Sequence, residues 1–272
     1  MKVRQANMKK ELQRALFSPK NIVLVAFVVF IMFFSAYNDG WKTALFASRA
    51  TDIANPEDVE YYQRYFGNVY RVWISSYSVI QVLIPLLLLI PYALTYTVEK
   101  QSQYRYLIVS REGKNRYFCH KVLSIIIAGV VIVGLAEIIF YGVSYIYTSH
   151  DSTGEYIYGI VENKDSIFYQ DASQYCALVF GSHLVYYASF LFFSVGITSF
   201  FKNRIAILLL PFLISSGFEL ILPSFMQPNV LLLPWITSEY SVYGYIGMVI
   251  MYCCVGIICL TITEKLYYRN ST

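Results

Sequence analysis

The chain has 272 residues, of which 57% are hydrophobic and only 14% are charged. An average soluble domain is about 45 to 50% apolar and about 25% charged, so this chain lacks the polar residues that would cover a surface in water. The composition excludes a disordered chain and argues against a soluble enzyme, and a net charge of +4 is too small to indicate a nucleic-acid partner. We therefore expect an integral membrane protein.

Six stretches approach the length of about 20 apolar residues that a helix needs to cross a membrane. They are residues 21–37, 72–98, 122–147, 176–200, 205–222 and 242–262. Runs such as residues 80–90 are apolar on every side, unlike the alternating strands of a membrane β-barrel. Pro85, Pro91 and Pro211 predict kinks or tilts in the second and fifth stretches. The fold class predicted is all-α, with residues 1–272 forming one transmembrane domain of six helices.

The basic residues predict how these helices are oriented. Five Lys and Arg residues fall on one side of the predicted membrane, at 42, 49, 64, 71 and 164. The other sixteen fall on the opposite side, which the positive-inside rule makes cytoplasmic: Lys2, Arg4, Lys9, Lys10, Arg14, Lys20, Lys100, Arg105, Arg111, Lys114, Arg116, Lys121, Lys202, Arg204, Lys265 and Arg269. Both termini are then cytoplasmic in a multi-pass protein of the cell membrane. The first stretch is interpreted as a retained anchor, because no convincing small-residue cleavage site follows it.

Residues 1–20 combine an apolar stripe with basic residues. Met8, Leu12, Ala15 and Leu16 share one helical face, and the lysines lie elsewhere. This pattern predicts an amphipathic helix in the cytoplasmic membrane interface, in contact with lipid. The alternative is an ordinary basic flank that only sets the topology.

The predicted outer loop 38–71 contains Asn55, Pro56, Glu57 and Asp58 in succession. A capping residue, a proline at the first helical position and acids in the first turn are typical of a helix start. We expect a short external helix there, whose tyrosines belong to an interfacial aromatic belt rather than to a ligand site.

The predicted cytoplasmic loop 99–121 is the longest on its side. It begins with Glu99 at the membrane exit, and Tyr104, Leu107 and Ile108 then form an apolar patch at helical spacing. An exposed apolar patch on a cytoplasmic helix is what a docking surface for another protein needs. The alternative is that the patch lies on the bilayer surface.

The arrangement of these elements resembles the permease subunits of ABC transporters of the exporter type 2 class. The matching features are six spans, an interfacial helix before the first, one prominent cytoplasmic loop and a re-entrant element before the sixth. The loop of that class has an acid at the membrane exit, a leucine-rich short helix, a turn of a small polar and a basic residue, and a lysine at the start of the third span. Here these places are occupied by Glu99, Leu107-Ile108-Val109, Ser110-Arg111 and Lys121. Two positions depart from the usual residues: Gln103-Tyr104 stands where Gly-Thr is common, and Val109 stands where a proline often precedes the Ser-Arg pair.

The resemblance implies that the loop is a coupling helix that docks on a separate ATPase subunit. Glu99, Tyr104, Leu107, Ile108, Arg111 and Lys121 would then couple the two chains. Two ATPase copies and a second permease, identical or related, are implied, with ATP and Mg²⁺ bound by the ATPase. This sequence contains no G-x-x-x-x-G-K-[ST] phosphate loop, so no cofactor and no catalytic residue are expected in it. The implied substrate is amphipathic or hydrophobic: a peptide, an antimicrobial or a lipid-like compound. The abundance of Tyr, Ile, Lys and Asn suits a low-GC bacterium.

Three ionisable residues fall within predicted spans. Glu137, His183 and Glu219 are costly in hydrocarbon, so they are candidates for the polar lining of a transport pathway. The alternative for each is a hydrogen bond between helices.

The remaining outer segments differ in polarity. Residues 148–175 are acidic and match no calcium-loop pattern. Residues 223–240 are apolar but interrupted by prolines, which predicts a pair of short re-entrant or interfacial helices.

Other functions are weaker matches to the sequence. An intramembrane protease would need paired Asp, Ser/His or zinc ligands, but the predicted spans contain no Asp and one His. The five cysteines show neither an external disulfide framework nor zinc-ligand spacing. A secondary transporter or channel without an ATPase partner stays open as the alternative function.

Overall fold

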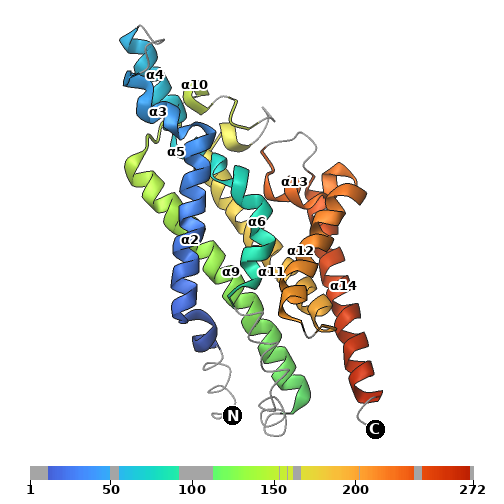
Figure 1. The fold of residues 1–272 in the computed structure, drawn as a ribbon. Coiled ribbons are helices and arrows are strands. Elements are labelled where there is room, and N and C mark those ends of the chain that lie inside the picture. Colours follow the sequence, from blue (N-terminus) through green and yellow to red (C-terminus); the bar gives the residue numbers. More distant parts are fainter. Residues whose placement is uncertain are drawn as a thin grey trace.

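The computed structural model describes residues 12–49, 55–91, 113–152, 154–157, 159–161, 167–201, 203–235 and 241–269. Within these ranges the chain is almost entirely helical and forms no strand, so the predicted all-α class is confirmed. The long helices run side by side as a bundle (Figure 1). They are α2 (Pro19–Ala36), α9 (Lys114–Tyr147), α11 (Ala172–Thr198), α12 (Arg204–Ile221) and α14 (Val242–Arg269).

Shorter elements connect or extend the long helices. They are the π-helical turn η1 (Tyr37–Trp41), α3 (Lys42–Phe46), η2 (Ala47–Arg49), α4 (Pro56–Phe66), α5 (Val69–Ser75), α6 (Tyr77–Leu89), α10 (Gly154–Ile157), η3 (Ile167–Tyr169), η4 (Ser224–Met226) and α13 (Pro228–Leu232).

Five helices of the described residues are long and apolar enough to cross a membrane. They cover Pro19–Arg49, Arg116–Tyr147, Ala172–Thr198, Arg204–Ile221 and Val242–Thr263. Helices α5 and α6 pass the same criterion only together, as a pair bent by 50°. The chain is therefore a membrane-embedded helical protein with five candidate spans, or six if the bent pair is one span.

The break in the second predicted span lies at Ser76, upstream of both of its prolines. Helix α6 runs through Pro85 to Leu89. At the break, the Ser76 hydroxyl donates to the Trp73 carbonyl at 2.6 Å, and serine hydroxyls that bond to the preceding turn are a known cause of helix bending. From α2, the buried Ser35 hydroxyl donates to the Ser75 carbonyl at 3.0 Å and accepts from the Val79 N–H at 3.2 Å. Serines rather than prolines therefore mark the bend.

The first helix continues beyond its predicted end at residue 37. Helix α2 passes into η1, α3 and η2, so the predicted outer loop begins as helix. Gly40 interrupts this helix with a φ of 145°, a conformation that L side chains rarely adopt.

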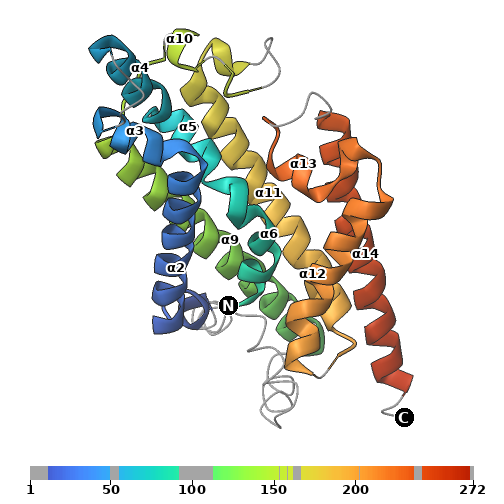
Figure 2. The same ribbon diagram turned by 45° about the horizontal axis from the view of Figure 1, so that its top comes forward.

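A helix is present where the sequence predicts one after Asn55: α4 begins at Pro56 with Glu57 and Asp58 in its first turn. Asn55 occupies the N-cap position, but its side chain donates to the Asp58 carboxylate at 3.1 Å instead of capping the backbone. Helices α3, α4 and α10 gather at one end of the bundle (Figures 1 and 2), where Tyr61 and Tyr156 bring α4 and α10 together with ring centroids 5.9 Å apart.

Helices α11 and α14 approach each other through glycine. A Cβ atom added at Gly196 would lie 2.8 Å from both the Cα and the carbonyl oxygen of Gly256. Backbones can approach this closely only where neither residue has a side chain, which is the usual device for packing helices in a membrane. Beside this contact, Phe190, Phe193 and Tyr252 pack with ring centroids between 4.8 and 6.1 Å apart.

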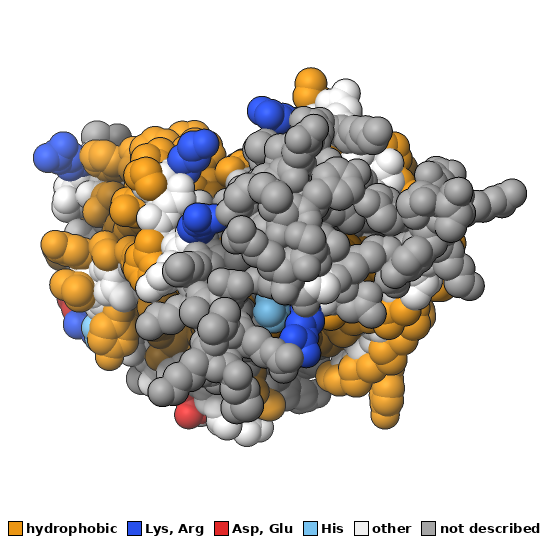
Figure 3. Space-filling model, turned by 90° about the horizontal axis from the view of Figure 1, so that it is seen from below, with side chains coloured by type: hydrophobic (Ala, Val, Ile, Leu, Met, Phe, Trp, Pro, Cys, Tyr) orange, Lys and Arg blue, Asp and Glu red, His pale blue; other side chains and the backbone are white. Residues whose placement is uncertain are grey.

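The end of the bundle opposite α4 is basic. Helices α2, α9 and α12 begin there and α14 ends there (Figure 1). Viewed onto this end, the coloured residues include several Lys and Arg side chains among hydrophobic ones and few Asp or Glu side chains (Figure 3). The predicted interfacial segment is described only from Leu12, where residues 12–16 are helical and Ala15 is buried. The Asn21 side chain donates to the Ala15 carbonyl at 2.5 Å, which fixes this segment to the start of α2.

Candidate functional site

Two of the three predicted intramembrane residues lie side by side. Glu137 comes from α9 and His183 from α11, with relative exposures of 2% and 0%. The His183 Nδ1 atom lies 3.5 Å from the Glu137 Oε2 atom. The bundle thus brings together an acid and an imidazole that are 46 residues apart in the sequence.

The partners of His183 indicate its tautomer. Its Nε2 atom lies 2.9 Å from the carbonyl oxygen of Leu232, which can only accept a hydrogen bond. We therefore assign the proton to Nε2. The Nδ1 atom then accepts from the Tyr77 hydroxyl, 3.2 Å away, whereas the Glu137 carboxylate at 3.5 Å is beyond the usual hydrogen-bond distance. Both ring nitrogens of His183 thus have partners, the Leu232 carbonyl and the Tyr77 hydroxyl.

The two carboxylate oxygens of Glu137 differ in their surroundings. Oε1 accepts a hydrogen bond from the Tyr187 hydroxyl, one turn beyond His183 on α11. Oε2 is buried and has no hydrogen-bond partner among the described residues. Tyr77 from α6, and His183 and Tyr187 from α11, are the titratable side chains that enclose this carboxylate. Oε2 therefore faces the imidazole of His183, 3.5 Å away, close enough for an ion pair when that ring carries a second proton.

Aromatic rings enclose the His183 side chain. The rings of Tyr77, Trp73 and Trp235 have centroids 5.0, 6.4 and 6.4 Å from the imidazole. Trp235 follows α13, and its ring packs 5.7 Å from Trp73 and 5.4 Å from Tyr77. The segment 223–235 contains two short helical elements, η4 and α13, and it covers the polar cluster through Leu232 and Trp235. Its predicted re-entrant or interfacial placement stays a prediction.

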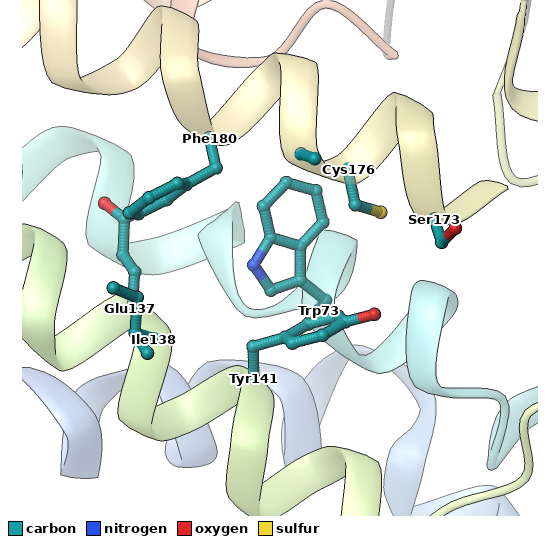
Figure 4. Close-up of a pocket in the computed structure, with 8 residues that line it drawn as sticks. Trp73, Glu137, Ile138, Tyr141, Ser173, Cys176 and Phe180 are labelled. Atoms are coloured by element: carbon teal, nitrogen blue, oxygen red, sulfur yellow. The ribbon is translucent and has the colours of Figure 1, made fainter.

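A cavity of about 180 Å³ lies between α9 and α11, over the end of α5. In Figure 4, the Trp73 ring occupies its middle, with Tyr141 of α9 on one side and Cys176 of α11 on the other. Glu137 and Phe180 close one end, and Ser173, at the start of α11, marks the other. The lining residues are Trp73, Glu137, Ile138, Tyr141, Ser173, Cys176, Ala177 and Phe180.

The mouth of the cavity opens to the outside of the bundle. Ile138, Ser173 and Ala177 line it and are exposed, whereas Trp73 and Glu137 are 2% exposed. The cavity thus leads from the surface of the bundle to a buried carboxylate.

Glu219 lies apart from this cluster. It is on α12, is partly exposed, and makes no hydrogen bond or ion pair with another described residue. The polar contact nearest to it in sequence on α12 is the 3.1 Å hydrogen bond between the Ser215 and Tyr252 hydroxyls. The three predicted pathway residues therefore do not form one site.

Most of the predicted coupling residues lie outside the described residues. These are Glu99, Tyr104, Leu107, Ile108 and Arg111. Lys121 is described, and its side chain is 1% exposed within α9, which begins seven residues earlier. Its predicted part in coupling remains a prediction.

The start of α11 is stabilised by an acid. Asp171 is the N-cap residue, and its carboxylate accepts from the Gln174 N–H at 3.0 Å and from the Ser173 hydroxyl at 2.8 Å. These hydrogen bonds lower the pKa of Asp171 below its usual value, the Gln174 N–H contributing most.

Sequence reasoning did not identify Trp73, Tyr77, Tyr187 and Trp235 as site residues. The available signal was spacing: Trp73 and Tyr77, and likewise His183 and Tyr187, are four residues apart and so share a helix face. In a chain with 26 Tyr and 19 Phe, that spacing alone does not distinguish a site from ordinary packing.

No known protein family, no curated protein and no solved structure matches this chain. Within the described ranges, no group of three or more His, Cys, Asp and Glu side chains is placed to hold a metal ion. The interpretation of the site therefore depends on its own geometry.

Proposed function

We propose that the chain is the membrane subunit of an ATP-driven exporter of the ABC class, with six spans formed by the five long helices and the bent α5–α6 pair. The observation that supports this most directly is the basic end of the bundle, where α9 begins just after residues 92–112. If positive residues face the cytoplasm, the segment with the apolar patch is presented to a cytoplasmic partner.

The proposed partner is an ATPase, because this sequence has no phosphate-binding loop of its own. ATP-driven movement of two ATPase subunits would be transmitted through residues 99–121 to α9, which continues from the basic end to Glu137 and the cavity. A second permease chain, identical or related, would complete the pathway.

The proposed substrate is amphipathic or hydrophobic. The cavity between α9 and α11 is lined largely by apolar and aromatic groups and opens toward the side of the bundle. A laterally open cavity of this kind suits a molecule that partitions into the membrane, such as a peptide antibiotic or a lipid-like compound.

Co-purification tests the proposal. We would purify the tagged full-length chain from its native membrane in mild detergent and identify the polypeptides that accompany it. The expected result is a stoichiometric subunit that hydrolyses ATP, together with ATP-dependent export in vesicles. Export that proceeds fully without ATP and without such a subunit would contradict the proposal.

A variant that introduces charge into the apolar patch tests the docking surface. Leu107→Asp combined with Ile108→Asp should abolish association with the ATPase, because carboxylates would replace the apolar patch. The matched control is Gln101→Asp with Gln103→Asp, which adds the same charge to polar positions in the same segment. If both variants retain the ATPase, the patch is not the docking surface.

One observation favours a secondary transporter as the second candidate function. The buried pair of Glu137 and His183 consists of two groups able to exchange protons, and such pairs in membrane helices often serve proton coupling. Transport that follows an imposed pH gradient in vesicles lacking ATP would support this candidate over the ATP-driven exporter.

A further inference from the structure

A buried group of polar side chains joins three helices. Tyr77 comes from α6, Glu137 from α9, and His183 and Tyr187 from α11, and none of them is more than 2% exposed. The His183 Nδ1 atom lies 3.2 Å from the Tyr77 hydroxyl and 3.5 Å from Glu137 Oε2, while Tyr187 donates to Glu137 Oε1. The Nδ1 atom therefore lies between a hydroxyl and a carboxylate, and either of them can be its partner.

The charge of this group depends on Glu137 and His183. Among the described residues, His183 is the side chain within ion-pair distance of Glu137 that can carry a positive charge. The other titratable side chains around the pair are phenols and a thiol, from α6, α9, α11 and α14: Tyr77, Tyr141, Cys176, Tyr186, Tyr187, Tyr245 and Tyr252. Helix α5 and the segment after α13 contribute Trp73 and Trp235, which do not titrate. Glu219 of α12 faces two of these tyrosines, Tyr186 and Tyr252.

An unbalanced negative charge is costly at this position. Beside a neutral His183, an ionised Glu137 would accept a hydrogen bond from Tyr187 alone among the described residues. A buried carboxylate without an opposite charge is strongly destabilised. One added proton removes the imbalance, either as a positive charge on His183 or as a neutral carboxyl group on Glu137. Two groups this close titrate as one unit.

We propose that Glu137 and His183 form one proton-binding site, and that the bound proton changes the partner of His183 Nδ1 from the Tyr77 hydroxyl to the Glu137 carboxylate. A neutral imidazole has a single acceptor lone pair, which is on Nδ1 here. A proton on Nδ1 turns that lone pair into an N–H bond that donates to Glu137, and a proton on Glu137 donates to the lone pair. In both cases the proton comes from water, the pair changes from negative to neutral overall, and Tyr77 loses its acceptor.

The response is confined to one side of the imidazole. The Nε2 N–H faces the Leu232 carbonyl with and without the added proton, so the contact with α13 is kept. Tyr77 is the first residue of α6 and follows Ser76 at the bend. Proton binding therefore weakens the attachment of the start of α6 to α11. The site requires only this chain, and its use to drive transport would rest on the secondary-transporter candidate above.

Nitrogen NMR of the His183 ring tests the site. The chain has three histidines, so His120→Gln with His150→Gln leaves His183 as the only imidazole in the full-length chain. With ¹⁵N-labelled histidine and the chain in nanodiscs, lowering the pH should shift the Nδ1 resonance in a single titration, because Nδ1 exchanges one partner for the other. The Nε2 resonance should stay in the range of a protonated nitrogen throughout.

Two conservative variants should move this titration in opposite directions. Glu137→Gln removes the carboxylate that favours the added proton, so the proton affinity should fall about 10-fold or more and the midpoint should move to lower pH. Tyr77→Phe removes the donor that competes for Nδ1, so the affinity should rise about 3-fold or more and the midpoint should move to higher pH. The matched control is Tyr186→Phe, since Tyr186 is equally buried but its hydroxyl lies near Tyr252 and Ser215. It should leave the midpoint unchanged.

The proposal is overturned if Nδ1 does not titrate while the chain stays monodisperse, or if Nε2 titrates in its place. It is also overturned if Glu137→Gln and Tyr77→Phe shift the midpoint in the same direction, or no more than Tyr186→Phe does. If one of the two variants is not monodisperse, the other still decides, because each shift has its own sign.

These outcomes are separate from those that test the proposed function. A pair that does not titrate leaves co-purification of an ATPase unaffected, and a chain without an ATPase partner can still bind the proton. A titrating pair in a chain whose transport ignores an imposed pH gradient would keep the proton site and contradict only the secondary-transporter candidate.

Discussion

Helix α11 is held by two different kinds of contact along its length. Its N-terminal part as far as Tyr187, called the polar half below, contributes His183 and Tyr187 to a polar and aromatic cluster with α6, α9 and α13. Its second half contributes Gly196 to a direct backbone contact with Gly256 of α14. Hydrogen bonds select partners by chemistry, whereas glycine contacts select them by shape. The polar half therefore contains groups that can bind or exchange protons, whereas the glycine contact sets the distance between the α11 and α14 backbones.

The largest loss of stability is expected at the close backbone contact between Gly196 and Gly256. Gly196→Ala should destabilise the protein by about 2 to 3 kcal/mol, because its Cβ would meet the backbone of Gly256 rather than a movable side chain. Thermal unfolding followed by size-exclusion chromatography in detergent measures the change. Gly181→Ala is the matched control on the same helix, since no atom lies within 4 Å of the added methyl group. It should be neutral or slightly stabilising. Equal destabilisation by both variants would contradict this assignment, because Ala favours the helix more than Gly does and only the close approach to Gly256 distinguishes the two sites.

An intermediate effect is expected in the polar half. Tyr187→Phe removes the hydrogen-bond donor to Glu137 Oε1 and should cost about 1 to 2 kcal/mol in the same unfolding measurement. Its neighbour offers a comparison, because Tyr186 is equally buried, but its hydroxyl lies near the Tyr252 and Ser215 hydroxyls without a contact as short as that of Tyr187 with Glu137. Tyr186→Phe should therefore cost less stability than Tyr187→Phe. The reverse order of the two variants would mean that the Glu137–Tyr187 contact does not stabilise the bundle.

The smallest effect is expected at the exposed start of the polar half. The pKa of Asp171 is lower in the folded chain than in the unfolded chain, so its cap contributes stability above its ordinary pKa of about 4 and loses it as the pH falls below that value. Asp171→Ala should lower the melting temperature slightly at pH 7. Asp171→Asn keeps a capping side chain and should remove the pH dependence of this contribution. A parent chain and an Asn variant that lose stability in parallel below pH 4 would contradict this assignment.

The sequence predicted the apolar helices well, because a run of about 20 apolar residues carries its own signal. It misplaced details that depend on neighbours. Helix α9 begins at Lys114, before the predicted apolar stretch 122–147, and the bend of the second span lies at Ser76 rather than at Pro85 or Pro91. The first turns of α9 are polar, and the bend depends on the hydroxyls of Ser76 and Ser35. Neither feature raises the hydropathy of the chain, so a search for apolar runs does not detect it.

The candidate site could be predicted only as separate residues. Glu137 and His183 were each identifiable because an ionisable group in hydrocarbon is costly. Their pairing depends on how α9 and α11 are rotated toward each other, which neither helix sequence specifies alone. Glu219 met the same criterion, yet it lies on a helix that is largely exposed, and it does not join the pair. The energetic cost of an ionisable group in hydrocarbon thus identifies candidate site residues, but it does not identify the neighbouring side chains that stabilise them.

The hydroxyl of Ser35 gives the bend in the second span an unexpected origin. Ser75 and Val79 are four residues apart, the pair that an unbroken α-helix joins through its own backbone. Here the Ser35 hydroxyl donates to the Ser75 carbonyl and accepts from the Val79 N–H. A side chain of α2 thus replaces the backbone hydrogen bond that is missing at the bend. The opened backbone is thereby satisfied in a region where water is scarce. The direction of the α5–α6 span is consequently encoded in two segments of the chain, and a helix cut out of this bundle would not keep it.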